Sequence, residues 1–267
     1  MSSLVEIEDL TVTYGARRRR ASAHALKGVD LDVRRGETLG LVGESGSGKT
    51  TLGRALLGLV PVAAGTVRFD GADVTRADRR TRRELSQRVQ VVFQNPFLAL
   101  NPQRTVAQSV AETLTTAPGV DRAEARRRSI EMLERVGIPA AAADRYPGSF
   151  SGGQRQRIAI ARALVPRPEL VICDEAVSAL DLSIQAQVLN LLVGLQDELG
   201  LTYLFITHDL AVVRHLCHRV AVLRRGELVE TGPTADVCAA PAHEYTRTLL
   251  ASAPVADPRR TGVGAPA

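Results

Sequence analysis

The chain has 267 residues, 45% of them apolar but only 3% aromatic, which is enough for one large or two small domains with an aliphatic core. Its formal charge of +5 is spread along the chain, so a nucleic-acid-binding protein is not favoured. No stretch approaches the roughly 20 apolar residues of a membrane-spanning helix. Acidic residues within the segment 1–14 argue against a secretory signal, and we expect a cytosolic protein.

The first third of the chain is expected to be rich in strands. Apolar and polar side chains alternate at 5–12 and 26–33, which predicts two strands with one wet face each. The basic run 17–20 lies between them and is expected to be a solvated loop. Further along the chain, the sequence predicts a buried strand at 38–42, a helix at 50–59, and strands at 67–69 and 89–93.

Helical periodicity dominates from about 95 to 155, where Asp121 is placed to cap a helix after the break at Pro118 and Gly119. This stretch predicts an inserted helical subdomain. Strands and helices then alternate: a helix at 151–164, a buried strand at 170–173, a helix at 183–199, a strand at 202–207, a helix ending near 216, and a hairpin of 219–223 with 227–231. The alternation predicts an α/β fold with a largely parallel sheet, and the tail after Pro254 is expected to be disordered.

A glycine-rich turn follows the strand at 38–42 and fits the phosphate-loop pattern G-x-x-x-x-G-K-[ST]. It consists of Gly43, Glu44, Ser45, Gly46, Ser47, Gly48, Lys49 and Thr50, with Thr51 next in the helix. Backbone N–H groups of such a loop surround phosphate oxygens, and the helix N-terminus adds partial positive charge. Lys49 would reach the β- and γ-phosphates, and the Thr50 hydroxyl would bind Mg²⁺.

The lysine content of the chain points to the same loop. Among 34 basic residues only Lys27 and Lys49 are lysines, and the others are arginines. A planar guanidinium would not enter the loop that a compact ammonium fits, which explains a lysine at position 49.

Two acidic residues, Asp174 and Glu175, follow the apolar strand at 170–173. A parallel strand delivers such carboxylates to the edge of the sheet where ligands bind. Asp174 would hold Mg²⁺ through water, and Glu175 would orient or deprotonate an attacking water. Together with the phosphate loop, these acids predict a nucleoside triphosphatase.

A second glycine-containing segment, Ser151, Gly152, Gly153 and Gln154, opens the helix at 151–164. Its hydroxyl, N–H groups and helix N-terminus could face an anion. A helix cap followed by flexible glycines, with no ligand, would have the same sequence.

The order of these three motifs resembles the ATP-binding-cassette family, and the resemblance runs from Leu4 to about Pro254. It implies a RecA-like phosphate-loop core, an N-terminal antiparallel β subdomain, the helical subdomain at about 95–155, and one nucleotide-binding domain over 1–254. It also implies that two such domains pair head to tail, so that each ATP lies between one phosphate loop and the Ser-Gly-Gly-Gln segment of the other subunit.

Four further residues match family positions. By this resemblance Tyr14 stacks on adenine, and Gln94 contacts Mg²⁺ and senses the membrane subunit. Asp181 lies in a loop that crosses the dimer interface, and His208 contacts the γ-phosphate. Phe150 stands where leucine is usual and Ala176 where proline often follows, but neither departure removes a catalytic group.

The subfamily resemblance is to oligopeptide and dipeptide importers, and it rests on 94–102, 175–187 and the C-terminal segment 241–250. It implies an ATP-hydrolysing subunit at the cytoplasmic face of the membrane, with two permease subunits, a second and different ATPase subunit, and indirectly an extracellular solute-binding protein. Nucleic acid is not an expected partner. Alternatives are a nickel or other solute importer, an exporter, or an accessory of carbon–phosphorus bond cleavage.

Cassette ATPases of DNA repair and of the ribosome are disfavoured, because the chain has neither sustained heptads nor a second cassette. The three cysteines, Cys173, Cys217 and Cys238, lack C-x-x-C spacing, so neither a disulfide framework nor a zinc or iron–sulfur site is expected.

Overall fold

The computed structural model describes residues 2–15, 23–114 and 119–252. The expected basic loop at 17–20, Pro118 and the expected tail after Pro254 lie outside these residues. Within the described part, none of the helices is long and apolar enough to cross a membrane.

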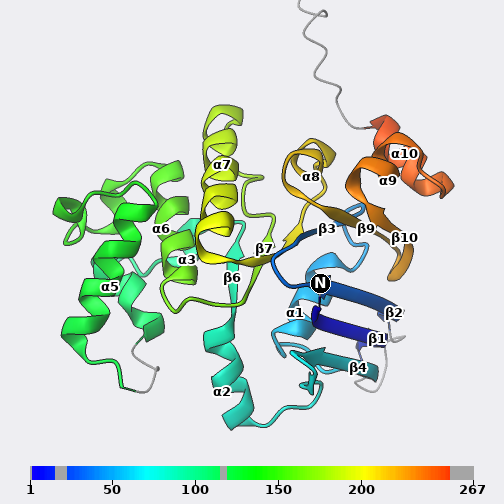
Figure 1. Cartoon of the computed structure of the whole chain (residues 1–267), viewed down its shortest axis with the longest axis horizontal. Coiled ribbons are helices and arrows are strands. Elements are labelled where there is room, and N and C mark those ends of the chain that lie inside the picture. The colour runs from blue at the N-terminus through cyan, green and yellow to red at the C-terminus, as the bar shows by residue number, and fades with distance from the viewer. Residues whose placement is uncertain (1, 16–22, 115–118, 253–267) are drawn as a thin grey trace, which may run out of the picture.

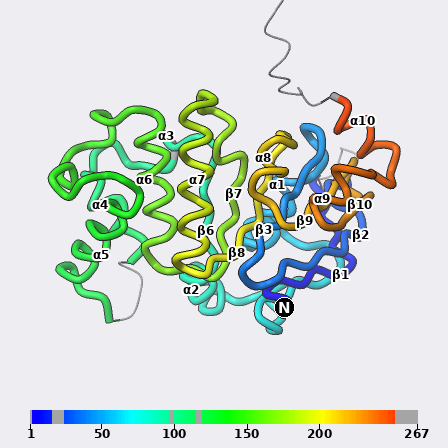
Figure 2. The backbone as a smooth tube through the Cα atoms, turned by 45° about the horizontal axis from the view of Figure 1, so that its top comes forward, coloured from blue at the N-terminus to red at the C-terminus, as the bar shows by residue number. Residues whose placement is uncertain are grey.

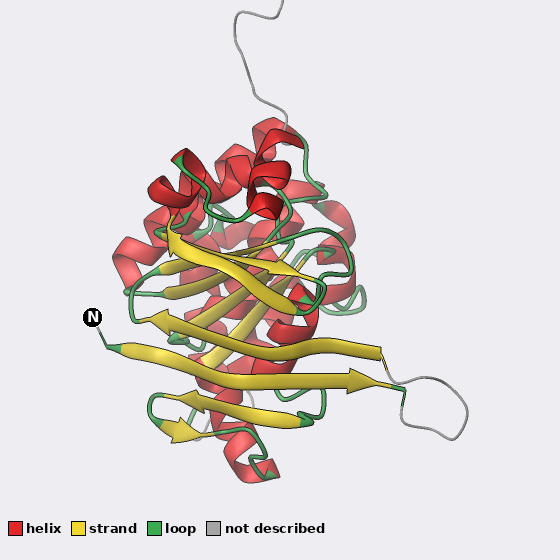
Figure 3. Cartoon of the chain, turned by 90° about the vertical axis from the view of Figure 1, so that its right-hand side faces the viewer, coloured by secondary structure: helices red, strands yellow, loops and turns green. Residues whose placement is uncertain are grey.

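Two sheets carry the fold, as Figures 1 and 3 show. The first is antiparallel, with the strand order β2-β1-β4-β5, and the second has the order β10-β9-β3-β8-β7-β6. In the second sheet β9, β3, β8, β7 and β6 run parallel, and β10 pairs antiparallel with β9. The strands are β1 (Ser3–Tyr14), β2 (Ala23–Arg34), β3 (Thr38–Val42), β4 (Ala64–Phe69), β5 (Ala72–Asp73), β6 (Val89–Phe93), β7 (Leu170–Asp174), β8 (Thr202–Ile206), β9 (Arg219–Arg224) and β10 (Glu227–Pro233). The predicted α/β fold with a largely parallel sheet and an antiparallel N-terminal sheet is confirmed.

Helices fill the connections. They are α1 (Lys49–Leu56), α2 (Arg79–Arg88), α3 (Pro96–Ala99), α4 (Val106–Ala111), α5 (Arg122–Arg135), α6 (Gly152–Leu164), α7 (Leu182–Leu199), α8 (Leu210–Leu216), α9 (Thr234–Ala239) and α10 (Glu244–Ser252), with 3₁₀ turns at Glu112–Leu114, Ala140–Ala142 and Pro147–Ser149. Helices α4, α5 and α6 pack on one another at one end of the molecule (Figure 2). The subdomain boundaries at about 95 and 155 stay a prediction.

The helix boundaries follow from local chemistry. Helix α7 ends at Leu199 and is capped by Gly200, which adopts the left-handed conformation with a φ of 67°. The helix expected at 50–59 ends earlier, at Leu56, because the chain turns at Gly58 with a φ of 66°. Helix α2 was not predicted, because none of its residues is buried and apolar periodicity is therefore missing.

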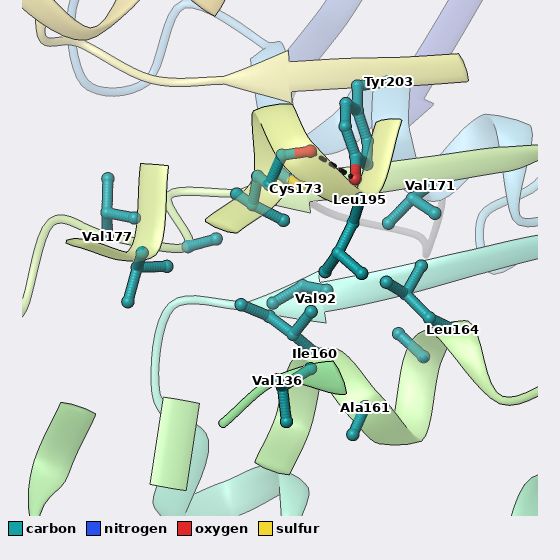
Figure 4. Packing of buried hydrophobic residues seen from close by; sticks show 14 of the residues in the cluster. Val92, Val136, Ile160, Ala161, Leu164, Val171, Cys173, Val177, Leu195 and Tyr203 are labelled. Carbon is teal, nitrogen blue, oxygen red and sulfur yellow. Dashed lines mark hydrogen bonds between the residues drawn. The ribbon is translucent and has the colours of Figure 1, made fainter. Parts of the chain in front are cut away.

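Alternate residues of the central strands enter two separate cores. In β7, Leu170 and Ile172 join the core between the two sheets, while Val171 and Cys173 join the core beneath α6 and α7. Figure 4 shows the second core, where the Tyr203 hydroxyl donates to the Leu192 carbonyl at 3.2 Å. Burial on both faces explains why these strands read as continuous apolar runs rather than as alternating patterns.

The cysteines differ in accessibility. Cys173 and Cys217 are buried, whereas Cys238 in α9 is partly exposed. Burial raises the pKa of the Cys173 thiol to about 12, so this side chain stays protonated and unreactive.

Four charged residues form an ion-pair ring between the sheets, which we call the ion ring: Arg35, Asp70, Arg88 and Glu169. Arg35 Nη1 lies 2.7 Å from Glu169 Oε2, and Arg88 Nη2 lies 2.7 Å from Asp70 Oδ2. Arg35 also pairs with Asp70, and Arg88 with Glu169. The ring joins the β2–β3 turn, the end of β4, the end of α2 and the start of β7.

Candidate functional site

The loop between β3 and α1 lies in close contact with its neighbours. A Cβ at Gly43 would lie 2.1 Å from the Leu223 carbonyl oxygen, and one at Gly48 would lie 2.6 Å from that of Ala25. Both residues also have positive φ angles, 151° and 111°. Only glycine satisfies both demands, so the spacing of glycines in the sequence reflects real steric limits.

Lys49 lies inside this loop and is 6% exposed. Its Nζ donates to the Gly43 carbonyl at 2.7 Å and to the Glu44 carbonyl at 2.9 Å. Burial lowers the pKa of Lys49, while the negative charges of Glu175 and Asp174 oppose this effect. A buried ammonium held only by carbonyl oxygens is well suited to a phosphate anion, which would supply a full negative charge.

A second observation supports an anion at this loop. The Ser47 hydroxyl is buried and has no hydrogen-bond partner among the described residues. Such groups are normally paired, so an unpaired hydroxyl inside the loop suits the oxygen of a bound phosphate. The phosphate-loop residues therefore fit a nucleotide.

Thr50 and Asp174 meet at the end of the parallel sheet. Thr50 Oγ1 donates to Asp174 Oδ1 at 3.1 Å. Burial raises the pKa of the Asp174 carboxyl, the bond from Thr50 opposes this shift, and the neighbouring charge of Glu175 adds to it. A divalent cation would relieve that repulsion. Protein sites for Mg²⁺ commonly offer one or two such oxygen ligands and leave the others to water and phosphates, and these two oxygens fit that pattern.

Glu175 has an unusual backbone, with a φ of 51°. Its N–H donates to the Ile206 carbonyl at 2.9 Å, which fixes the turn after β7 against the end of β8. Its Oε1 lies 3.4 Å from Nδ1 of His208, and the side chains of Glu175 and His208 are 27% and 59% exposed. A left-handed non-glycine residue held in place by its surroundings is a feature that concentrates at functional sites.

Gln94, which follows β6, joins this group through Ser178. Gln94 Nε2 donates to the Ser178 hydroxyl at 3.1 Å, and that hydroxyl donates to the Glu175 carbonyl at 3.0 Å. The contacts thus bring Lys49, Thr50, Asp174, Glu175, His208 and Gln94 to the end of the parallel sheet. For Asp174 and Glu175 this is the edge that the preceding apolar strand predicted.

The Ser151–Gln154 segment lies elsewhere. Figures 1 and 2 place α6 on the opposite side of α7 from α1 and the phosphate loop. Ser151 caps α6 in a reciprocal pair, with Gln154 N donating to Ser151 Oγ at 3.3 Å and Ser151 N donating to Gln154 Oε1 at 3.0 Å. Helix α7 thus lies between α6 and the elements that flank the phosphate loop.

Two other expected site residues are exposed on the surface of the chain. Tyr14 ends β1 and is 40% exposed. Asp181 caps α7, where its carboxylate accepts from the Ile184 N–H at 2.9 Å, and it remains exposed. Both are open to a ligand or to a second subunit.

Two contacts with the site were not predicted. Gln156 in α6 is fully buried, and its Nε2 donates to the Ala176 carbonyl at 2.6 Å, directly after Glu175. Tyr245 in α10 accepts a hydrogen bond from the Glu44 N–H at 2.9 Å. The only signal for Gln156 is an amide on the apolar face of a helix, and the sequence gives no signal for the contact of Tyr245.

Comparison with known proteins identifies the family. A model described as ABC transporter matches residues 26–178, more than half of the chain. The chain belongs to the ABC transporter family. A second model, for the C-terminal region of oligopeptide/dipeptide transporters, matches residues 229–266 of this ABC protein. It is therefore an ABC ATPase, and the sequence-based identification of the family is confirmed.

Relatives and solved structures agree with this result. A Brucella abortus protein named "Putative peptide import ATP-binding protein" is 51% identical over 94% of this chain and 77% of its own length. The glutathione import ATP-binding protein GsiA of Pectobacterium atrosepticum is 50% identical over 89% of this chain and 38% of its own length. Among structures, cbiO1 of Clostridium perfringens, part of the cbiONQ complex, matches with a TM-score of 0.80 and 30% identity over 90% of this chain and 92% of its own. The ATP-binding cassette MJ0796, dimeric and bound to ADP and Pi, matches with a TM-score of 0.76 and 30% identity over 86% of this chain and 98% of its own.

The two departures from the family pattern lie in the interior of this ABC ATPase. Phe150 is 5% exposed, with the Arg145 guanidinium 5.0 Å from its ring centroid. Ala176 is buried beside Glu175. Both side chains fill apolar space and contribute no polar group to the site.

Proposed function

We propose that this ABC ATPase energises the import of peptides or similar small solutes across the cytoplasmic membrane. Two observations support the solute class: the match of residues 229–266 to the oligopeptide/dipeptide region, and relatives named for peptide and glutathione import. The observation that carries the motor function is the grouping of Lys49, Thr50, Asp174 and Glu175 at one sheet edge.

In this proposal the phosphate loop, residues 43–50, with Thr51 beside it, holds the phosphates of ATP. Lys49 donates to β- and γ-phosphate oxygens while the Gly43 carbonyl continues to hold its Nζ, and Ser47 gains the partner it lacks. Thr50, Asp174 and Gln94 would hold Mg²⁺, whose chemistry is to neutralise phosphate charge. Tyr14 stacks on the adenine.

Hydrolysis depends on the carboxylate of Glu175. It accepts a proton from the attacking water, and the turn after β7, fixed by the Glu175 N–H on the Ile206 carbonyl, holds its backbone in place. His208, 3.4 Å away, positions the same water and the γ-phosphate. The exposed side chain of His208 can turn toward the ligand.

The second wall of each site comes from another subunit. Helix α6, which begins at the Ser151–Gln154 segment, lies across α7 from α1, and Asp181 is exposed. Both features support a head-to-tail pair, in which Ser151, Gly152, Gly153, Gln154 and Asp181 face the other subunit. Peptide importers of the family pair two different ATPases, so we propose a heterodimer, attached to two permease subunits and served by an extracellular solute-binding protein. The chain would then work as a peripheral protein on the cytoplasmic face.

The test is uptake of a labelled peptide by a strain that lacks this chain. Peptide uptake should disappear, return with the wild-type gene, and fail to return with Glu175→Gln, while uptake of a free amino acid stays normal. Normal peptide uptake without the chain would refute the solute class. Purification through a tag on this chain, followed by mass analysis, should yield one copy beside a different ATPase, and two copies with no second ATPase would refute the heterodimer.

A further inference from the structure

The C-terminal helix α10 contacts the phosphate loop through a single side chain. Tyr245 is 5% exposed, and its hydroxyl oxygen accepts the Glu44 N–H at 2.9 Å across 201 positions of sequence. Figure 1 shows α10 beside α9, beyond β10 and far along the chain from α1. The contact links a region matched to oligopeptide/dipeptide transporters with the loop that holds Lys49.

The peptide group between Gly43 and Glu44 is held on both sides. Its N–H donates to Tyr245, and its carbonyl accepts from Lys49 Nζ at 2.7 Å. In a trans peptide these two groups point in opposite directions, and none of the described peptide bonds is cis. When this peptide plane is oriented so that the Glu44 N–H reaches Tyr245 outside the loop, the Gly43 carbonyl therefore points at Lys49 inside the loop.

Neighbouring residues hold both the ring and the backbone of Tyr245 in place. The Arg224 guanidinium lies 4.9 Å from its ring centroid, and the Tyr245 N–H donates to Nδ1 of His243 at 3.0 Å. The segment before α10 is tied to β10, because Glu230 accepts from the N–H groups of Ala242 and His243 at 2.8 and 3.0 Å. The ring thus has little freedom to withdraw.

From this geometry we propose that Tyr245 is a positioning residue for nucleotide binding: it fixes the Gly43–Glu44 peptide plane and thereby holds Lys49 ready for the phosphates. The proposal rests on the role of Lys49 stated under Proposed function. It gives the C-terminal region a task in the ATP site, in addition to any contact it makes with other subunits.

The test is Tyr245→Phe, which removes the hydroxyl and keeps the ring against Arg224. We expect the KM and the Kd for ATP to rise roughly three- to tenfold, the range that one neutral hydrogen bond spans, while kcat at saturating ATP stays within about twofold. Hydrogen exchange at the Glu44 amide, measured by mass spectrometry on the full chain without nucleotide, should become faster.

The matched control is Tyr203→Phe, which also removes a hydroxyl bonded to backbone, here the Leu192 carbonyl in the core. It should lower the melting temperature without changing the ATP affinity or the exchange of Glu44. An unchanged Kd with unchanged exchange in Tyr245→Phe would overturn the proposal, and so would an equal loss of affinity in Tyr203→Phe. Faster exchange at Glu44 without a change in Kd would also overturn it, whereas a wild-type chain that binds no ATP would instead refute the proposed function.

Discussion

Glu175 has a strained backbone, and its carboxylate lies at the edge of the site. Replacing it by glutamine keeps the shape and removes the base, so ATP binding should be retained and turnover should fall about a hundredfold or more. The measurements are the Kd for MgATP and the rate of phosphate release, with size-exclusion chromatography to detect a trapped closed dimer. Near-normal turnover would remove Glu175 from the role of base.

Lys49 permits a sharper test of the phosphate loop. Lys49→Arg preserves the charge, so a purely electrostatic role predicts a mild effect. The loop is too narrow for a planar guanidinium, since Lys49 Nζ already contacts two carbonyls. We therefore expect ATP binding or hydrolysis to fall at least tenfold, measured by equilibrium binding and steady-state kinetics. Lys27→Arg, on the surface, is the matched control and should be neutral, and a variant of Lys49 that retains most activity would contradict the steric argument.

Among single residues, the sequence predicts a place in the site for those that belong to a short motif. The phosphate loop, Asp174 and Glu175 were found because local spacing and a preceding apolar strand carry the information. Tyr245 and Gln156 were not found, because their partners, Glu44 and Ala176, lie elsewhere in the sequence and only folding brings them together.

Helices α6 and α7 meet at a glycine. A Cβ at Gly153 would lie 2.5 Å from Ile184 Cγ2, whereas one at Gly152 meets no atom within 4 Å. Gly153→Ala should therefore force the helices apart and cost about 1–3 kcal/mol of stability. Gly152→Ala, the matched control one position earlier, should be neutral or slightly stabilising. Thermal unfolding of both variants checks this, and an equal melting temperature would contradict the packing.

Elements were predictable where their residues are buried. The strands of the central sheet and helices α5, α6 and α7 follow from apolar runs, caps and a terminal glycine. Helix α2 was missed because it lies on the surface and owes its start to the Asp78 cap, which accepts from the Thr81 N–H at 2.8 Å. A polar helix without an apolar face leaves no periodic signal.

At the scale of the whole molecule, the ion ring joins the two sheets and makes stability depend on pH. Hydrogen bonds from Arg88 lower the pKa of Glu169 against the effect of burial, and Arg35 adds to the shift. Because the folded-state pKa lies below the ordinary value of 4.5, the stabilisation is present above that value and is lost as the pH falls through the folded pKa.

Glu169→Gln should accordingly lower the melting temperature at pH 7, and the difference from wild type should shrink as the pH falls below 4.5 and through the lowered pKa of Glu169. Glu84→Gln is the control, because its pair with Arg80 is highly exposed and contributes little. Calorimetry across this pH range is the measurement. A gap between Glu169→Gln and wild type that stays constant with pH would show that the ring does not titrate.

The burial of two thiols has a practical consequence for labelling. Of the three cysteines, all within the described residues, Cys173 and Cys217 are enclosed, and only Cys238 is open to a reagent. A maleimide spin label should therefore attach once per native chain, on α9, without any engineered cysteine. Electron paramagnetic resonance would then detect a dipolar distance wherever two copies of this chain associate, and would report the spacing and its change with ATP directly.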